Sequence, residues 1–300
     1  MTEWFLSLEG TSRGHQVALY LTILAAIFHA TIGALQKGKH DPWLSRGAID
    51  ICYGVMAAPI AFFIVPWPSA EMWPILIIAL LIHSVYKVLQ GWTYSRGAYT
   101  VVYPVVRGTT PLFTIIGSYF VFGEILTPIQ WAGVLFLVSG IISLALFNLN
   151  TIVLDRHKLA SALVLAVTTG VFVAAYTTYD AYGIRAAINP FTFIFWLFMI
   201  DGFFIPTVAF FRWRSMDIKP DLQGLFGRGF FGAIIAFFSF GSIMMATRLD
   251  NVGEIAVVRE TSVIFAALIG SLFLNERVGS KRLILIVVIA FGAVVTKIGG

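Results

Sequence analysis

Val105-Val106-Arg107-Gly108-Thr109-Thr110 is repeated later in the chain as Val257-Val258-Arg259-Glu260-Thr261-Ser262. The two arginines are 152 residues apart, since 259 − 107 = 152. The same offset relates three other pairs of identical residues: Phe113 and Phe265, Glu124 and Glu276, and Gly140 and Gly292. Each arginine lies in a long apolar run that ends in an acidic turn. The chain is therefore a doubled unit, which suggests a site at the junction of two halves.

The composition predicts an all-α integral membrane protein. Of the 300 residues, 59% are hydrophobic and 12% are charged, whereas about a quarter of the residues are charged in a typical soluble domain. The net charge of +5 comes without any basic stretch on a soluble fold, so we expect no nucleic-acid partner and read the excess as loop charge. Cys52 is the single cysteine, which excludes an internal disulfide and a zinc site made by cysteines.

Ten apolar runs are long enough to cross a bilayer, whose core needs about 20 residues of helix. The predicted spans are Val17–Gln36, Gly47–Val65, Trp73–Trp92, Thr100–Phe122, Pro128–Phe147, Leu159–Tyr182, Phe191–Phe211, Gly224–Thr247, Val252–Leu274 and Leu283–Ile298. A break at 148–158 divides them into five helices in residues 1–150 and five in residues 151–300. Because each half has an odd number of spans, the second half is expected to insert upside down, as in many transporters.

Lysine and arginine are concentrated in alternate loops. The loops numbered 1, 3, 5, 7 and 9 hold most of them, and the termini and remaining loops hold only Arg13, Arg185, Arg248 and Lys297. By the positive-inside rule the first group is cytoplasmic. The sequence thus predicts a multi-pass protein of the plasma (inner) membrane with both termini outside.

Several stretches resemble EamA-type transporters of the drug/metabolite transporter superfamily. They are Phe28-His29-Ala30 and Gln36-Lys37 in the first span, Tyr99 to Pro104 leading into Arg107, the Gly123-Glu124 turn, Gly133 and Gly140 in the fifth span, and their second-half counterparts. The resemblance covers nearly the whole chain. It implies ten helices in two inverted five-helix repeats around a central cavity, and transport of small metabolites, often export of amino acids or related compounds.

Arg107 and Arg259 are the first candidates for a binding site, because a charge at the bilayer centre costs about 2.5–3.5 kcal/mol and needs a partner, water or a function. On the fourth span Tyr103, Arg107, Thr110 and Thr114 share one helical face. Each arginine could pair with an acid such as Glu260, Glu124 or Asp201 and hold the repeats together. Alternatively it could clamp an anion, because guanidinium matches carboxylate and phosphate with paired donors.

The third span carries a second polar face, made of His83, Tyr86, Lys87, Gln90 and Tyr94. Lys87 could bind substrate or could snorkel to the cytoplasmic side. His83 could carry a proton or could be a satisfied core histidine.

The remaining candidates lie on the sixth, seventh and first spans. Tyr176, Tyr179 and Asp180 share a face of the sixth span, Asp201 lies near the middle of the seventh, and His29 lies on the first. The tyrosines are candidate substrate-binding residues. Asp180, Asp201 and His29 are candidate proton-coupling groups, although Asp201 could instead neutralise a buried cation.

These observations predict a secondary transporter, with export favoured, that uses no cofactor and no metal. We find no phosphate loop, metal motif or nucleophile elbow. Buried cations exceed the obvious acids on the cavity faces, which favours a small substrate with an anionic group bound between the third, fourth, sixth and ninth helices. One chain holds both repeats, so a monomer is sufficient. The alternatives are a flippase for lipids or lipid-linked headgroups and, less favoured, an intramembrane enzyme or an apolar multidrug exporter.

Overall fold

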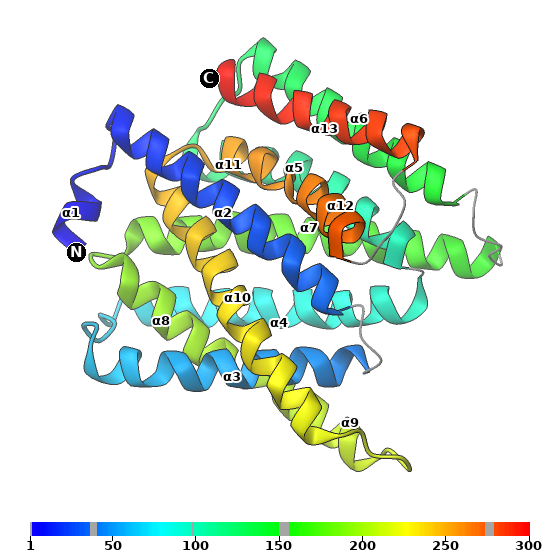
Figure 1. Ribbon diagram of the computed structural model, residues 1–300. Helices are drawn as coiled ribbons and strands as arrows, with labels where there is room; N and C mark the ends of the chain where they lie inside the picture. The colour runs from blue at the N-terminus through cyan, green and yellow to red at the C-terminus, as the bar shows by residue number, and fades with distance from the viewer. Residues whose placement is uncertain (1, 37–40, 98, 150–155, 274–278) are drawn as a thin grey trace.

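The computed structural model describes residues 2–36, 41–97, 99–149, 156–273 and 279–300, and within these ranges helices are joined by short connections, with no strand (Figure 1). Eight helical segments of the described residues are long and apolar enough to cross a membrane, and Leu283–Ile298 is a shorter apolar helix. The fold is therefore an all-helical membrane fold, as predicted. The count of ten spans and their inverted arrangement stay predictions.

The helices of the first half follow the predicted runs closely. After a short α1 (Thr2–Leu6) come α2 (Ser12–Gln36), α3 (Pro42–Phe63), α4 (Met72–Arg96), α5 (Tyr99–Phe122) and α6 (Pro128–Leu149). The start of α3 is fixed locally, because Pro42 occupies the first turn and the Asp41 carboxylate accepts hydrogen bonds from the backbone N–H groups of Trp43 and Leu44.

In the second half, two of the expected spans are each divided. The helices are α7 (Arg156–Ala186), α8 (Pro190–Asp201), α9 (Phe204–Arg214), α10 (Leu222–Leu249), α11 (Val252–Arg259), α12 (Ser262–Phe273) and α13 (Ser280–Ile298). The first divided span, predicted as 191–211, lies within one candidate membrane span, Pro190–Arg214, whose helix is interrupted at Gly202 and Phe203. The described part of the second, 252–273, is interrupted at Glu260 and Thr261.

The first interruption coincides with a close contact between helices, and the second with short-range hydrogen bonding. A Cβ atom placed on Gly202 would lie 2.6 Å from the Cα of Gly54, so the backbones of α3 and the α8–α9 junction touch there. At the second break the amide groups of Glu260 and Val263 donate to carbonyls three residues back, the tighter pattern of a 3₁₀ turn. As a result, Asp201 and Arg259 both stand at the carboxyl end of a short helix.

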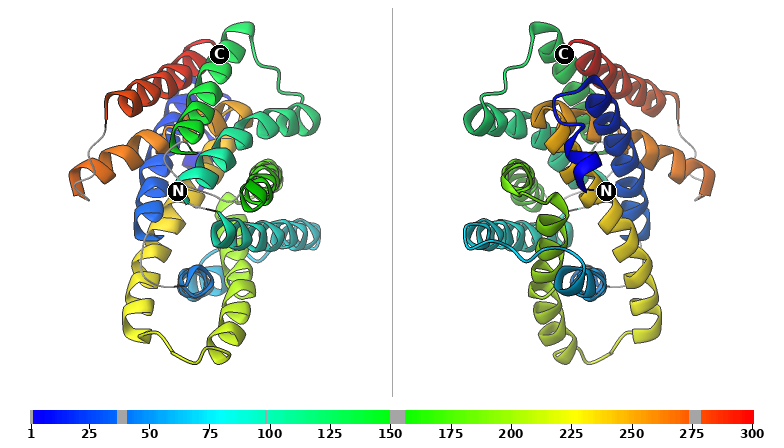
Figure 2. Two further views of the ribbon diagram at one scale, coloured as in Figure 1. Left: turned by 90° about the vertical axis from the view of Figure 1, so that its right-hand side faces the viewer. Right: turned by 90° about the vertical axis from the view of Figure 1, so that its left-hand side faces the viewer.

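The helices pair in the same way in both halves. The pairing of α4 with α7 is matched by that of α10 with α2, and the pairing of α5 with α7 by that of α11 and α12 with α2. The α6 helix packs along α13, which is its counterpart (Figure 1). The labelled N and C ends lie toward the same end of the bundle in Figure 1, and Figure 2 gives views along the bundle from either end. This symmetry is what a doubled unit requires, and the boundary between 1–150 and 151–300 stays a prediction.

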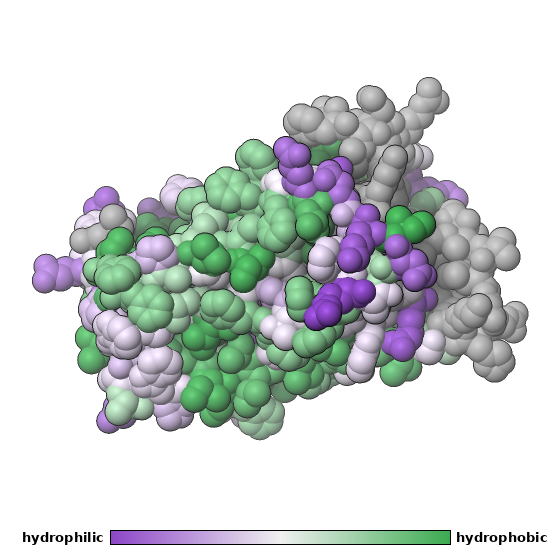
Figure 3. Space-filling model, turned by 90° about the horizontal axis from the view of Figure 1, so that it is seen from below, coloured by the Kyte–Doolittle hydropathy of each residue, from purple (hydrophilic) through white to green (hydrophobic). Residues whose placement is uncertain are grey.

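The outer surface is suited to lipid. Seen from below, the middle of the molecule is mostly hydrophobic, and hydrophilic residues gather toward the ends (Figure 3). Large apolar side chains such as Phe63, Phe120 and Phe231 are exposed. An apolar surface of this kind is unfavourable in water and favourable in a bilayer.

The close crossing of α6 and α13 can be tested with glycine substitutions. A Cβ atom on Gly292 would lie 2.5 Å from the Leu137 nitrogen and 2.6 Å from the Gly133 oxygen. We expect Gly292→Ala to force the helices apart and lower the Tm in detergent. On the exposed face of α10, Gly227 has no atom within 4 Å of such a Cβ. Gly227→Ala should therefore leave the Tm unchanged or raise it, because alanine favours helix by about 1 kcal/mol. Equal effects of the two substitutions would contradict the close packing.

Candidate functional site

A buried ion-pair network joins four helices near the centre of the bundle. Its members are Arg46, Asp50 and Tyr53 from α3, His83 and Lys87 from α4, Asp180 from α7 and Asp201 from α8. The Arg46 Nε atom lies 2.7 Å from the Asp50 carboxylate. Burying these charges costs desolvation free energy, and the fold can offset that cost only when each charge has a partner.

Lys87 is the most fully bound member of the network. Its side chain is buried and its Nζ donates to Asp50 Oδ2 at 2.6 Å, Asp201 Oδ2 at 2.6 Å and the Tyr53 hydroxyl at 2.7 Å. These three bonds match the three donors of an ammonium group. The snorkelling interpretation of Lys87 was therefore wrong, since the side chain turns inward to two carboxylates.

His83 stands between two acids. Its Nε2 lies 2.9 Å from Asp180 Oδ2, and its Nδ1 lies 3.9 Å from Asp201 Oδ2. The Tyr53 hydroxyl also donates to Asp201 Oδ2 at 2.6 Å. The histidine is thus neither lone nor isolated, and it links the acid on α7 to the acid on α8. Three of the residues singled out in the sequence meet at this point.

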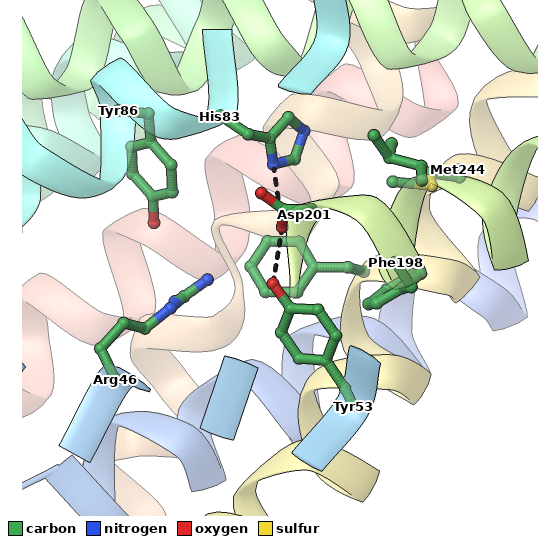
Figure 4. Close-up of a pocket in the computed structure, with 9 residues that line it drawn as sticks. Arg46, Tyr53, His83, Tyr86, Phe198, Asp201 and Met244 are labelled. Atoms are coloured by element: carbon green, nitrogen blue, oxygen red, sulfur yellow. Dashed lines mark hydrogen bonds and ion pairs between the residues drawn. The ribbon is translucent and has the colours of Figure 1, made fainter. Parts of the chain in front are cut away.

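A small cavity opens beside this network. Figure 4 shows side chains from α3, α4, α8 and α10 around it, among them Arg46, Tyr86 and Asp201. Phe240 of α10 also lines it. Its volume is about 20 Å³, which is the room needed by about one water molecule. A metabolite would fit only after the helices separate. Of the four helices expected to form the walls, only α4 contributes to this cavity, because the polar side chains of α5 and α11 turn toward each other instead.

Arg107 is paired with an acid of the other half. Its Nη1 donates to Glu260 Oε1 at 3.2 Å, and its guanidinium lies 5.2 Å from the centre of the Tyr103 ring. Both Arg107 and Glu260 are buried. Glu260, one of the three acids that the sequence offered as a partner for Arg107, is therefore the one that it meets, and a substrate-binding role for Arg107 stays a prediction.

Arg259, the counterpart of Arg107, differs from it. It is 2% exposed, and within the described residues its Nε and Nη2 atoms have no hydrogen-bond partner. Its guanidinium stands 5.5 Å from the centre of the Phe240 ring, a contact that compensates only part of the cost of burying a cation. On the next residue, Glu260 Oε2 is also buried without a hydrogen-bond partner.

Phe240 connects this arginine to the small cavity. The ring lines the cavity and also contacts His29 and Tyr176 edge-on, each with ring centres 6.3 Å apart. The Nδ1 atom of His29 is buried without a partner among the described residues. Arg259 of α11 and His29 of α2 therefore both contact Phe240, the ring that forms part of the cavity wall.

The charges of the two clusters balance when the histidines are neutral. Arg46, Lys87, Arg107 and Arg259 supply four positive charges, and Asp50, Asp180, Asp201 and Glu260 supply four negative charges. The expected excess of buried cations is therefore not present. The imbalance is local, because Glu260 is the electrostatic neighbour of both Arg107 and Arg259 but accepts a hydrogen bond only from Arg107.

The other predicted residues fall into two groups. Tyr86 and Tyr176 are buried, with their rings tilted against each other and ring centres 4.8 Å apart, and Tyr176 also contacts His83. Thr110 donates to the backbone oxygen of Val106, and Tyr179 packs on Tyr182, away from the cavity. The first pair adjoins the site, whereas Thr110 and Tyr179 have no contact with the cavity.

Four members of the site were not among the predicted site residues. They are Arg46, Asp50 and Tyr53 of α3 and Phe240 of α10. The spacing of Arg46, Asp50 and Tyr53 at i, i+4 and i+7 was the available signal, because it places all three on one face of α3. Phe240 gave no such signal among 27 phenylalanines.

Comparison with known proteins agrees with this architecture. One solved structure, described as "Crystal structure of protein", matches with a TM-score of 0.77 and 14% sequence identity over 94% of this chain and 96% of its own. At that identity the likeness shows the fold alone. No curated protein sequence matches the chain. The model of the EamA-like transporter family matches residues 16–146 and 160–298. The chain therefore belongs to the EamA-like transporter family, and it is a multi-pass membrane protein of a family of transporters.

Proposed function

We propose that the protein is a secondary transporter that moves a small polar metabolite with an anionic group between two inverted repeats. The observation that carries the proposal is Arg259, a buried guanidinium with two donor atoms that have no hydrogen-bond partner in the described part of the chain. Guanidinium recognises carboxylate and phosphate groups through paired hydrogen bonds. Its place at an interrupted helix supports the same conclusion, because transporters commonly bind substrate where a spanning helix is broken.

The size of the cavity supports alternating access. At about 20 Å³ it is closed to a metabolite, so substrate must enter when the helices around it separate. The symmetric helix pairing favours rocking of one half against the other, as in inverted-repeat transporters. Export is the direction implied by the family resemblance, and with both termini outside, substrate would enter from the end that carries most of the Lys and Arg residues.

The paired and unpaired arginines supply a matched pair of variants. We expect Arg259→Gln to raise the KM for an anionic substrate about tenfold to hundredfold, since a hydrogen bond to a charged group contributes roughly 1.5–3 kcal/mol. Its Tm should hold or rise, because among the described residues the Arg259 side chain has no ion-paired or hydrogen-bonded acid to lose. Uptake into proteoliposomes, screened with amino acids, organic acids and phosphorylated compounds, measures the first effect.

Arg107→Gln is the control with the opposite expectation. It leaves Glu260 buried without its cation, which costs about 3–5 kcal/mol, so the Tm in detergent should fall. Transport by Arg259→Gln at the wild-type KM would sink the anion-binding role. A fall in Tm for Arg259→Gln as large as that for Arg107→Gln would make both arginines structural.

The proton-coupling role belongs to His83, Asp180 and Asp201, with His29 as an outlying candidate. His83 spans the distance between the two carboxylates, so a proton taken at one acid has a path to the other. We therefore propose that a proton moves through this series of side chains while substrate moves past Phe240.

The same His–Asp geometry would also serve the alternative function, an intramembrane enzyme. Such an enzyme would turn over a substrate in detergent without any compartment.

Asp180→Asn separates coupling from transport. We expect the variant to exchange substrate across proteoliposomes at equal concentration but to lose accumulation driven by a pH gradient, because the amide does not take up a proton. Asp217→Asn, in the exposed α9–α10 connection, should retain both activities. If Asp180→Asn still accumulates substrate against a gradient, the proton path runs elsewhere.

The flippase alternative differs in its cargo. A lipid carrier needs a route open to the bilayer from the binding site, whereas the cavity beside Asp201 is lined by buried or partly buried side chains from α3, α4, α8 and α10. Uptake of headgroup-sized anions without acyl chains supports a metabolite transporter. Movement of intact lipid alone would favour the flippase.

A further inference from the structure

An apolar groove lies apart from the proposed transport site, between α3, α9 and α10. Its lining includes Ile51 from α3, Phe210 and Trp213 from α9, and Leu222 and Phe226 from α10. Every side chain that lines it is apolar, and its volume is about 250 Å³. An apolar cavity of roughly 150 Å³ holds a molecule of benzene, so this groove has room for part of an acyl chain.

The course of α9 explains why the groove exists. The α8–α9 junction is fixed against α3 by the contact of Gly202 with Gly54. Beyond it, α9 and α10 diverge on either side of α3 and meet again only at the 215–221 connection, as Figure 2 shows. Phe210, Leu222 and Phe226, which line the groove, are exposed, so the groove is open toward the surroundings, which in a bilayer are lipid chains.

Cations stand over the aromatic rings of the groove. The Lys219 Nζ lies 4.5 Å from the centre of the Trp213 ring, and the Arg214 guanidinium lies 5.9 Å from the centre of the Phe210 ring. Within the described residues neither cation has an acid partner, whereas the neighbouring Arg212 is paired with Asp41 at 2.7 Å. The arrangement is an apolar slot with two free positive charges at its mouth.

The surroundings of this mouth keep it positive and at the membrane surface. Residues 212–228 carry four basic and two acidic side chains, a net charge of 4 − 2 = +2. One of the two acids, Asp221, is engaged in capping the start of α10. Ile218, at the tip of the connection, is 89% exposed, as suits a side chain immersed in lipid. On the predicted orientation this end is cytoplasmic, the side on which anionic lipids are enriched.

We propose that the groove between α3, α9 and α10 is a binding site for an anionic phospholipid, with an acyl chain along Phe210 and Phe226 and the phosphate at Arg214 and Lys219. A lipid with a net negative headgroup would satisfy both cations at once, whereas a zwitterionic lipid would bring its own cation to the same place. The site is independent of the proposed transport function, because none of its lining residues belongs to the ion-pair network or the Arg259 cluster.

Native mass spectrometry of the full chain in detergent tests the site. The probes are phosphatidylglycerol and phosphatidylcholine with identical acyl chains. We expect wild type to bind phosphatidylglycerol on the order of tenfold more tightly, because a basic residue near a membrane surface contributes about 1 kcal/mol toward anionic lipid. The double variant Arg214→Gln/Lys219→Gln should lose this preference. Leu222→Trp, which fills the mouth of the groove, should weaken binding of both lipids.

The matched control is Arg96→Gln, since Arg96 also stands over an exposed ring, that of Trp92, at 5.7 Å but lies outside the groove. It should keep the wild-type preference. Equal binding of the two lipids by wild type, or a preference that survives the double variant, would overturn the proposal. Binding of glycerol 3-phosphate alone at the same residues would assign a free-phosphate site instead. A change in oligomeric state caused by Leu222→Trp would make the groove a contact between copies of the chain.

Discussion

Every charged side chain in the interior of this bundle has to be compensated without bulk water. A buried ion pair with complete hydrogen bonding roughly recovers its desolvation cost, and an unpaired buried charge does not. Lys87 meets this condition fully through Asp50, Asp201 and Tyr53. The network around it ties α3, α4, α7 and α8 together, so these helices are positioned by charge as well as by apolar packing.

The two halves of the repeat meet this condition to different extents, and the proposed function rests on that difference. Where the first half has Gly108 in a continuous helix, the second has Glu260 at a break. The single carboxylate binds Arg107 and leaves Arg259 with unused donors. On the proposed function, the satisfied guanidinium of Arg107 gives structural support and the unsatisfied guanidinium of Arg259 receives the negative group of the substrate. Phe240 stands between that place and the cavity beside Asp201.

Much of the fold could be predicted because its determinants are local or periodic. The apolar run lengths gave the helices of the first half to within a few residues, and the repeated arginines indicated the doubled unit. The breaks at Gly202 and Glu260 could not be predicted, because the first depends on a contact with Gly54 and the second on short-range bonding in an otherwise apolar run.

The site was predicted in part. Single-helix faces identified His83, Lys87, Asp180 and Asp201, but which acid meets which base is decided by how helices pack. The groove between α9 and α10 likewise could not be predicted from the residues that line it, because it depends on the break between α8 and α9.

The most direct test of the central claim, that Arg259 binds the anionic group of the substrate, is ligand-dependent thermal stability of the purified protein. A compound that binds the folded state raises the Tm by mass action. Wild type should be stabilised by small carboxylates or phosphorylated compounds from a mixed panel of anions, cations and apolar molecules, and the shift should vanish in Arg259→Gln. Stabilisation only by cations or apolar compounds, or a shift from anions that persists in Arg259→Gln, would contradict the claim and move the search to Asp180 and Asp201.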